Sequence, residues 1–130
     1  MQPIISSFIF ATNVITAYLY KQYYIYSILF TALTLTSFMY HSNSNIYTNI
    51  IDKCAIGSIV LYGAYMLYNK FNIDKLLEVI LVFSCFFSIN YLYIYGYYNK
   101  KYCYDPEWGN YYHGLLHFIS SLGHHIIIFL

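Results

Sequence analysis

Two histidines, His113 and His117, stand four residues apart in an otherwise apolar stretch near the end of the chain. In a helix, residues at positions i and i+4 lie on the same face, so both imidazoles would point the same way. Ionisable side chains in an apolar membrane helix are costly and commonly mark a functional site. Imidazole nitrogens are common zinc ligands, and a catalytic zinc uses three protein ligands and one open position. The pair therefore predicts two of three zinc ligands.

The candidate third ligand is His41, from a different part of the chain. The residues between His113 and His117 are Gly-Leu-Leu, so the glutamate of the zincin motif H-E-x-x-H is missing and a general base must come from elsewhere. Asp52 is the candidate for that base. Ser37 precedes His41 by one helical turn, where it would hydrogen-bond the metal-bound water or a developing oxyanion. The predicted site therefore has three metal ligands, with Asp52 and Ser37 as catalytic residues.

The elements that must position these residues are predicted to be transmembrane helices. The 130 residues are 60% hydrophobic and only 8% charged, whereas about a quarter of the residues in soluble domains are charged. Apolar stretches near the length that a bilayer requires predict a single all-α domain over residues 1–130, an integral multi-pass membrane protein with a bundle of about five transmembrane helices. The predicted spans are residues 4–20, 23–41, 46–68, 76–98 and 111–130.

The composition also excludes several classes of function. The six basic residues form no run and the net charge is +1, so the chain has no footprint for nucleic acid. The three cysteines lack C-x-x-C spacing, which argues against a disulfide framework or a zinc knuckle. The composition indicates a membrane-embedded chain, and an oligomer remains compatible with the sequence.

Alternation of the spans brings the candidate residues to one side of the membrane. The end of the second span, the start of the third and the start of the fifth must lie on the side of the N-terminus. For single residues other interpretations remain open: His41 as a loop histidine, Asp52 and Lys53 as an interfacial charge pair, and His113 and His117 bonded to neighbouring helices or to each other. Taken together, the five candidate residues lie at a similar depth in the membrane, and this favours a metal site.

Two further histidines are expected to lie outside this site. His124 returns to nearly the same helix face as His113, but it lies about 10 Å deeper than His117. We expect it to line the interior or to bond a neighbouring helix. His125 points elsewhere and is expected to be packed or near the far interface. Residues 99–110 are predicted to form the longest connection, with Trp108 in an aromatic belt at the headgroup interface.

The candidate residues resemble those of a known family. Residues 37–41, S-F-M-Y-H, resemble the S-x-x-[FY]-H motif of the alkaline ceramidases, whose superfamily includes the adiponectin/progestin receptors and membrane hydrolases that remodel GPI anchors. Asp52 is similar in spacing to the ceramidase aspartate. Residues 113–123, H-G-L-L-H-F-I-S-S-L-G, resemble the last-helix pattern H-x-W-W-H-x-x-T-G-L-G. Leucines replace the two tryptophans here, and about five helices replace the seven that are usual in the family.

The resemblance implies that the three histidines bind zinc while the serine and the aspartate hold the zinc-bound water. The first hypothesis is therefore a zinc-dependent intramembrane hydrolase of a lipid amide or ester, similar to a ceramidase. The alternative is a receptor-like or structural membrane protein without enzymatic activity, in which zinc only joins two helices or is absent. Ceramide as the substrate does not follow from the motifs.

Overall fold

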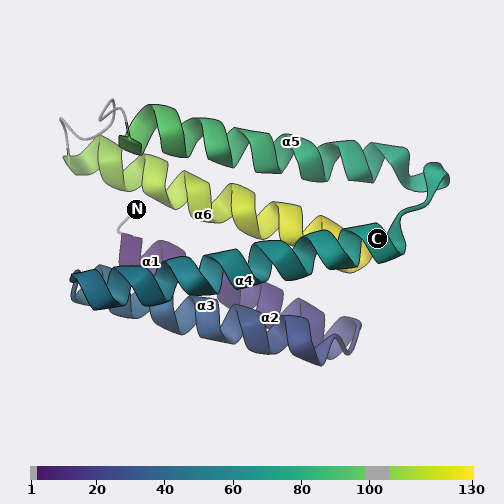
Figure 1. Ribbon diagram of the computed structural model, residues 1–130, viewed down its shortest axis with the longest axis horizontal. Helices are drawn as coiled ribbons and strands as arrows, with labels where there is room; N and C mark the ends of the chain where they lie inside the picture. Colours follow the sequence, from purple (N-terminus) through teal and green to yellow (C-terminus); the bar gives the residue numbers. More distant parts are fainter. Residues whose placement is uncertain (1–2, 99–105) are drawn as a thin grey trace.

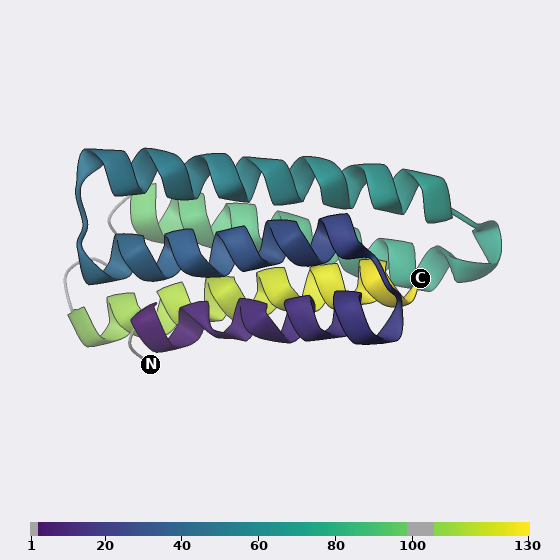
Figure 2. The ribbon, with the colours of Figure 1, turned by 90° about the horizontal axis from the view of Figure 1, so that it is seen from below.

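The computed structural model describes residues 3–98 and 106–130, and these residues form helices and no β-strand. Five helical rods lie side by side along one axis, as Figures 1 and 2 show. The elements are α1 (Pro3–Ser7), α2 (Ile9–Ile15) and the π-helical turn η1 (Thr16–Tyr20) in the first rod; α3 (Tyr24–Ser42); α4 (Ile46–Lys70); the short turn η2 (Ile73–Lys75) with α5 (Leu76–Leu92) and η3 (Tyr93–Tyr98); and α6 (Pro106–Phe129). The predicted all-α bundle of about five helices is confirmed.

Three of these rods are long and apolar enough to cross a membrane: Pro3–Tyr20, Ile46–Lys70 and Ile73–Gly96. Their large apolar side chains are mostly exposed; Leu61 on α4 and Phe87 on α5, for example, keep 74% and 65% of their surface accessible. Such outward-facing apolar surface is what a lipid-facing helix presents. Within the described residues, α3 and α6 are not among the three, because polar side chains interrupt their apolar sequences.

The first rod lies between α3 and α6, while α4 packs along α3 and α5 packs along α6. The N-terminus, the end of α3 and the starts of α4 and α6 lie at the same end of the bundle (Figure 2). This arrangement has a direct consequence for the predicted site. His41 in the last turn of α3 and His113 near the start of α6, 72 positions apart in the sequence, therefore share one end of the molecule.

A capped turn fixes the junction between α3 and α4. Asn45 Oδ1 accepts hydrogen bonds from the backbone N–H groups of Tyr47 at 2.9 Å and Thr48 at 3.0 Å, and Thr48 Oγ1 accepts from the Asn45 N–H at 3.0 Å. This reciprocal capping box satisfies donors that the first turn of a helix leaves free. His41 lies in the last turn of α3 and not in the loop, so its side chain projects from a helix.

Helix α6 begins at Pro106, earlier than the predicted start at residue 111. Proline suits the first position of a helix because its missing N–H would have no partner there, and Glu107 in the first turn suits the helix dipole. The prediction of a connection over residues 99–110 is therefore wrong for 106–110, and residues 99–105 lie outside the described part of the chain. The Trp108 ring contacts the rings of Tyr111 and Tyr112.

Hydrogen bonds between the first rod and α6 set their register. Asn13 Nδ2 donates to the Ser121 carbonyl at 3.0 Å, and Ser121 Oγ donates to Asn13 Oδ1 at 2.5 Å. Both side chains are buried. Further along, Thr12 Oγ1 lies 3.0 Å from His125 Nε2. Polar side chains in apolar surroundings need partners, so these pairs favour one register of α6 against the first rod.

A second buried pair joins α3 to α6 deeper in the bundle. Tyr26 Oη lies 2.5 Å from His124 Nδ1, and both side chains are buried. Helix α4 approaches this pair through Gly63, which has no side chain and is itself buried. At the far end Lys70 Nζ donates to the carbonyls of Ile127 at 2.7 Å and Ile128 at 2.9 Å, which satisfies acceptors in the last turn of α6.

Candidate metal centre

The three histidines predicted as ligands meet between α3 and α6. His41, His113 and His117 each offer a ring nitrogen, and these three nitrogens all lie within 4.8 Å of one another. The Nε2 atoms of His41 and His113 are 3.1 Å apart, so one of them carries a proton that the other accepts. The ring of His117 stands 4.7 Å from that of His113 and 5.6 Å from that of His41. The predicted convergence of the three histidines is confirmed.

The chemistry of this donor set fits a metal ion such as zinc. Nitrogens that share a tetrahedral zinc lie about 3.3 Å apart, given Zn–N bonds of 2.0–2.1 Å, and the separation between His41 Nε2 and His113 Nε2 is close to this value. All three nitrogens lie within 4.8 Å of one another, so a shift of at most about 1.5 Å would bring the third nitrogen to the separation expected around zinc. Neutral imidazole is the ligand form, so the proton between the Nε2 atoms of His41 and His113 would have to move to Nδ1 of its own ring before both Nε2 atoms could bind one metal ion.

His117 has a hydrogen-bond partner that the sequence did not point to. Ser6 Oγ, on α1, lies 2.8 Å from His117 Nδ1 and also bonds the Pro3 carbonyl at 2.9 Å. The Ser6 side chain has no accessible surface. The Phe10 ring packs against His117, with 5.1 Å between the ring centroids. The first rod therefore contacts His117 through both a hydrogen bond and a ring contact.

Ser37 is buried one turn before His41 on α3, as predicted, but its hydroxyl faces the first rod. Ser37 Oγ lies 2.9 Å from Ser7 Oγ, and Ser7 Oγ also bonds the Pro3 carbonyl at 3.0 Å. Because that carbonyl can only accept, the Ser7 proton is directed to Pro3 and the Ser37 hydroxyl donates to Ser7. The lone pairs of Ser37 Oγ are then free to accept a hydrogen bond, for example from a water molecule.

Asp52 lies on α4 close to α3 and is 4% exposed. Within the described residues, its only hydrogen bond comes from Thr36 Oγ1, at 3.3 Å to Oδ1, and Thr36 also lies 3.2 Å from the Leu33 carbonyl. A buried carboxylate with one long, shared hydrogen bond is poorly satisfied. Its oxygens are not part of the three-histidine cluster. The structure thus places Asp52 near the start of α4, at the same end of the bundle as the histidines but outside their cluster.

The two deeper histidines have ordinary partners. His124 bonds Tyr26, and His125 lies against Thr12. Each joins α6 to a neighbouring helix and neither belongs to the cluster. For His124 the structure favours the bond to a neighbouring helix, the simpler of its two expected roles.

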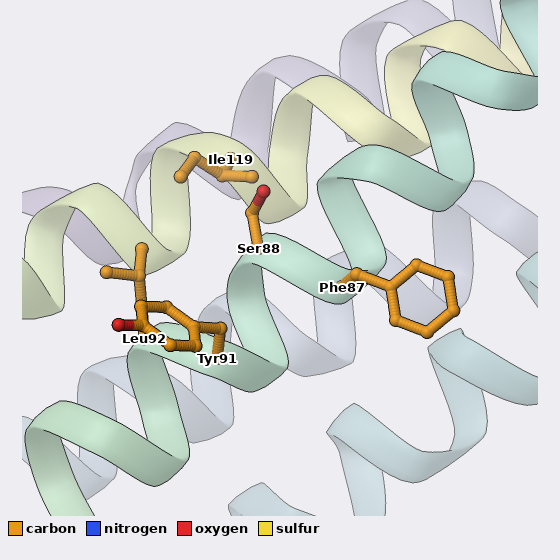
Figure 3. A pocket seen from close by; sticks show the side chains of 5 residues that line it. All are labelled: Phe87, Ser88, Tyr91, Leu92 and Ile119. Atoms are coloured by element: carbon orange, nitrogen blue, oxygen red, sulfur yellow. The ribbon is translucent and has the colours of Figure 1, made fainter.

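A surface groove of about 470 Å³ runs between α5 and α6 (Figure 3). Its lining is mostly apolar and consists of Phe87, Ser88, Tyr91, Leu92 and Ile119. Ile119 follows His117 by two residues, a turn of about 200° around the helix. The groove therefore lies on nearly the opposite side of α6 from the histidine cluster and is not part of the candidate site.

Sequence reasoning missed Ser6, Ser7 and Thr36, because serine and threonine are common in packed helices and carry no charge. One signal was present. Ser6 and Asn13 are seven residues apart, so they lie on the same face of one helix. The alternation of spans that brings the histidines to one end of the bundle also brings the start of the first span to that end. Polar residues on one face of the first span could therefore have indicated that this face packs against α6.

Comparisons of the chain with protein-family models, with curated proteins and with solved structures found no match. The functional interpretation therefore depends on the geometry of the site.

Proposed function

We propose that this chain is a multi-pass membrane protein that binds zinc through His41, His113 and His117 and hydrolyses a lipid amide or ester, in the manner of the alkaline ceramidases that its motifs resemble. The observation that carries the proposal is the convergence of three imidazoles from two helices at one end of an apolar bundle. Histidine is uncommon inside apolar helices unless it serves a function. A catalytic zinc usually has three protein ligands, which is the number of histidines in this cluster.

Each residue of the site has a role that follows from its surroundings. When bound, zinc would supply Lewis-acid chemistry, polarising a scissile carbonyl and acidifying water. Asp52 would accept the proton of the attacking water at Oδ2, since Oδ1 already accepts from Thr36. Ser37 would orient that water by accepting a hydrogen bond at Oγ, because its own proton is directed to Ser7. These roles of Asp52 and Ser37 are the ones that their positions in the ceramidase-like motifs imply.

The bilayer would supply the substrate. The apolar outer faces of α4 and α5 suit contact with acyl chains. The charged groups of Lys21, Lys70 and Lys75 gather at the end of the bundle opposite the histidines, where they contact residues 127–130. A lipid whose polar linkage reached the histidine end would keep its acyl chains among apolar helices. This placement argues for an intramembrane substrate in preference to a soluble one.

A structural zinc is the second candidate, and the position of Asp52 favours it. The carboxylate bonds Thr36 and lies outside the histidine cluster, which is compatible with a metal that only joins α3 to α6. In that account the protein binds zinc but performs no hydrolysis, as a receptor-like or structural membrane protein would.

Replacement of Asp52 by Asn distinguishes the two accounts. If Asp52 is the general base, Asp52→Asn keeps the shape of the side chain and the bound zinc but lowers lipid hydrolysis by about 10² to 10⁴-fold, the usual contribution of such a group. The assay measures fatty-acid release from ceramides and from ester lipids by the zinc-loaded protein in detergent or vesicles, together with zinc content.

Asp74→Asn is the matched control, because Asp74 lies at the opposite end of the bundle in η2 and its replacement should leave turnover unchanged. Equal turnover by wild type and Asp52→Asn would remove the general-base role. A protein that binds zinc stoichiometrically but releases no fatty acid from any lipid in the panel would favour the structural account.

A further inference from the structure

Of the three candidate ligands, His117 alone has a fixed partner on its second ring nitrogen within the described residues. Ser6 Oγ lies 2.8 Å from His117 Nδ1. His41 and His113 bond each other through their Nε2 atoms, and no hydrogen bond to the Nδ1 atom of either is found among the described residues. Partners of this kind matter because they select the tautomer and the orientation of a metal-binding imidazole. The contact with Ser6 therefore singles out His117.

The direction of the hydrogen bond follows from the second contact of Ser6. A hydroxyl has one proton, and the Pro3 carbonyl, 2.9 Å from Ser6 Oγ, can only accept. If Ser6 donates to Pro3, the His117 Nδ1–H donates to Ser6 and both short contacts are hydrogen bonds. If Ser6 donated to His117 Nδ1, its contact with Pro3 would set two oxygen lone pairs against each other. The first arrangement leaves His117 Nε2 unprotonated, in the form that a metal ion needs.

The backbone around Ser6 is shaped to hold it in place. Ser6 and Ser7 both bond back to the Pro3 carbonyl, a pattern that bends helices. The helix is interrupted at the next residue, Phe8, whose N–H bonds Ile5 O at 3.2 Å in a tighter i to i−3 turn. This turn separates α1 from α2. Successive residues of a helix point about 100° apart, and Ser6 accordingly contacts α6 while Ser7 contacts α3. Ser6 itself is completely buried.

We propose that Ser6 is a positioning residue for the metal site: it accepts a hydrogen bond from His117 Nδ1–H, fixes that tautomer, and thereby directs Nε2 to the other two histidines. The proposal rests on the metal site proposed above, but it predicts a property of the metal-free protein as well. Ser6 touches no substrate or metal and acts through the orientation of His117.

The test measures zinc affinity and the tautomer of His117 in wild type, Ser6→Ala and Ser7→Ala. Ser7→Ala is the matched control, because Ser7 is equally buried and bonds the same carbonyl, but its other partner is Ser37 and not a histidine. Loss of such an outer partner typically lowers metal affinity 10–100-fold. We expect Ser6→Ala to lose about this much, whereas Ser7→Ala stays within about threefold of wild type.

The tautomer is measured on metal-free protein by ¹⁵N chemical shifts of labelled histidines, with the His117 signal assigned by its absence in His117→Ala. We expect Nδ1–H in wild type and a mixture of tautomers in Ser6→Ala. Wild-type zinc affinity in Ser6→Ala, equal losses in the two serine variants, or an Nε2–H tautomer in wild type would overturn the proposal. If wild type bound no zinc but showed the Nδ1–H tautomer, the proposed function would fail while the role of Ser6 in orienting His117 would stand.

Discussion

His117→Ala is expected to lower zinc affinity by more than about 100-fold, because it removes a direct ligand and not merely an outer partner, whose loss alone costs 10–100-fold. The variant keeps the bond between His41 and His113, but two imidazoles hold zinc less tightly than three. Titration against a chromophoric chelator, with the protein in detergent, measures the change. His41→Ala should behave in the same way, since its ring supplies the α3 side of the cluster.

The control for this experiment is His125→Ala. His125 is on the same helix and has the same ring chemistry, but it lies against Thr12 and outside the cluster. Its removal should leave zinc affinity within about threefold of wild type. If His117→Ala and His125→Ala bound zinc equally well, the metal would have to be held by other groups and the three-histidine centre would be wrong.

Gly63→Ala is expected to destabilise the bundle, whereas Gly57→Ala on the same helix is not. A Cβ atom at position 63 would lie 2.8 Å from His124 Cε1 and 3.1 Å from Tyr26 Oη. Neither ring can easily withdraw, because the two are hydrogen-bonded to each other and the His124 ring packs against Phe30, 5.1 Å between centroids. Overpacking of this kind typically costs about 1–3 kcal/mol, more than alanine gains over glycine in a helix, about 0.5–1 kcal/mol.

A Cβ atom at Gly57 meets no atom within 4 Å, so Gly57→Ala keeps only the helix-forming advantage of alanine. The two variants should therefore shift the free energy of unfolding in opposite directions. Thermal or denaturant unfolding in detergent micelles measures this difference. Equal shifts for the two variants would mean that α4 does not approach the pair of Tyr26 and His124 as the structure has it.

The three histidines could be predicted from the sequence because two rules of geometry sufficed. The spacing of His113 and His117 fixes their common face, and alternation of apolar segments fixes the end of the bundle at which they meet His41. Both rules act on chemically unusual residues, since a histidine in an apolar stretch stands out.

The surroundings of the histidines could not be predicted in the same way, because they depend on how far each helix is rotated about its axis. The depth of Asp52 follows from the sequence, but its hydrogen bond from Thr36 depends on the rotation of α4 against α3. In the sequence Ser6 resembles any other small polar residue of an apolar helix, and only its contacts with His117 and Pro3 single it out. The rotation of each helix is set by side-chain packing over the whole interface, and residue spacing along the sequence does not reveal it.

The start of α6 shows a different limit. Asp105-Pro106 and Gly109 are typical loop residues, so the sequence predicts a loop where the first turns of α6 lie. Proline at the first position and an acidic residue in the first turn also favour the start of a helix, and in the structure the helix begins there. The extra turns extend α6 beyond the histidines at that end of the bundle.

The most direct test of the central claim is the zinc content and zinc-edge X-ray absorption spectrum of the purified wild-type protein. The three-histidine centre predicts one zinc per chain, with imidazole nitrogens at about 2.0–2.1 Å and no sulfur ligand. A protein that retains no stoichiometric zinc, or a spectrum with a sulfur shell at about 2.3 Å, would contradict the assignment of His41, His113 and His117 as the metal ligands.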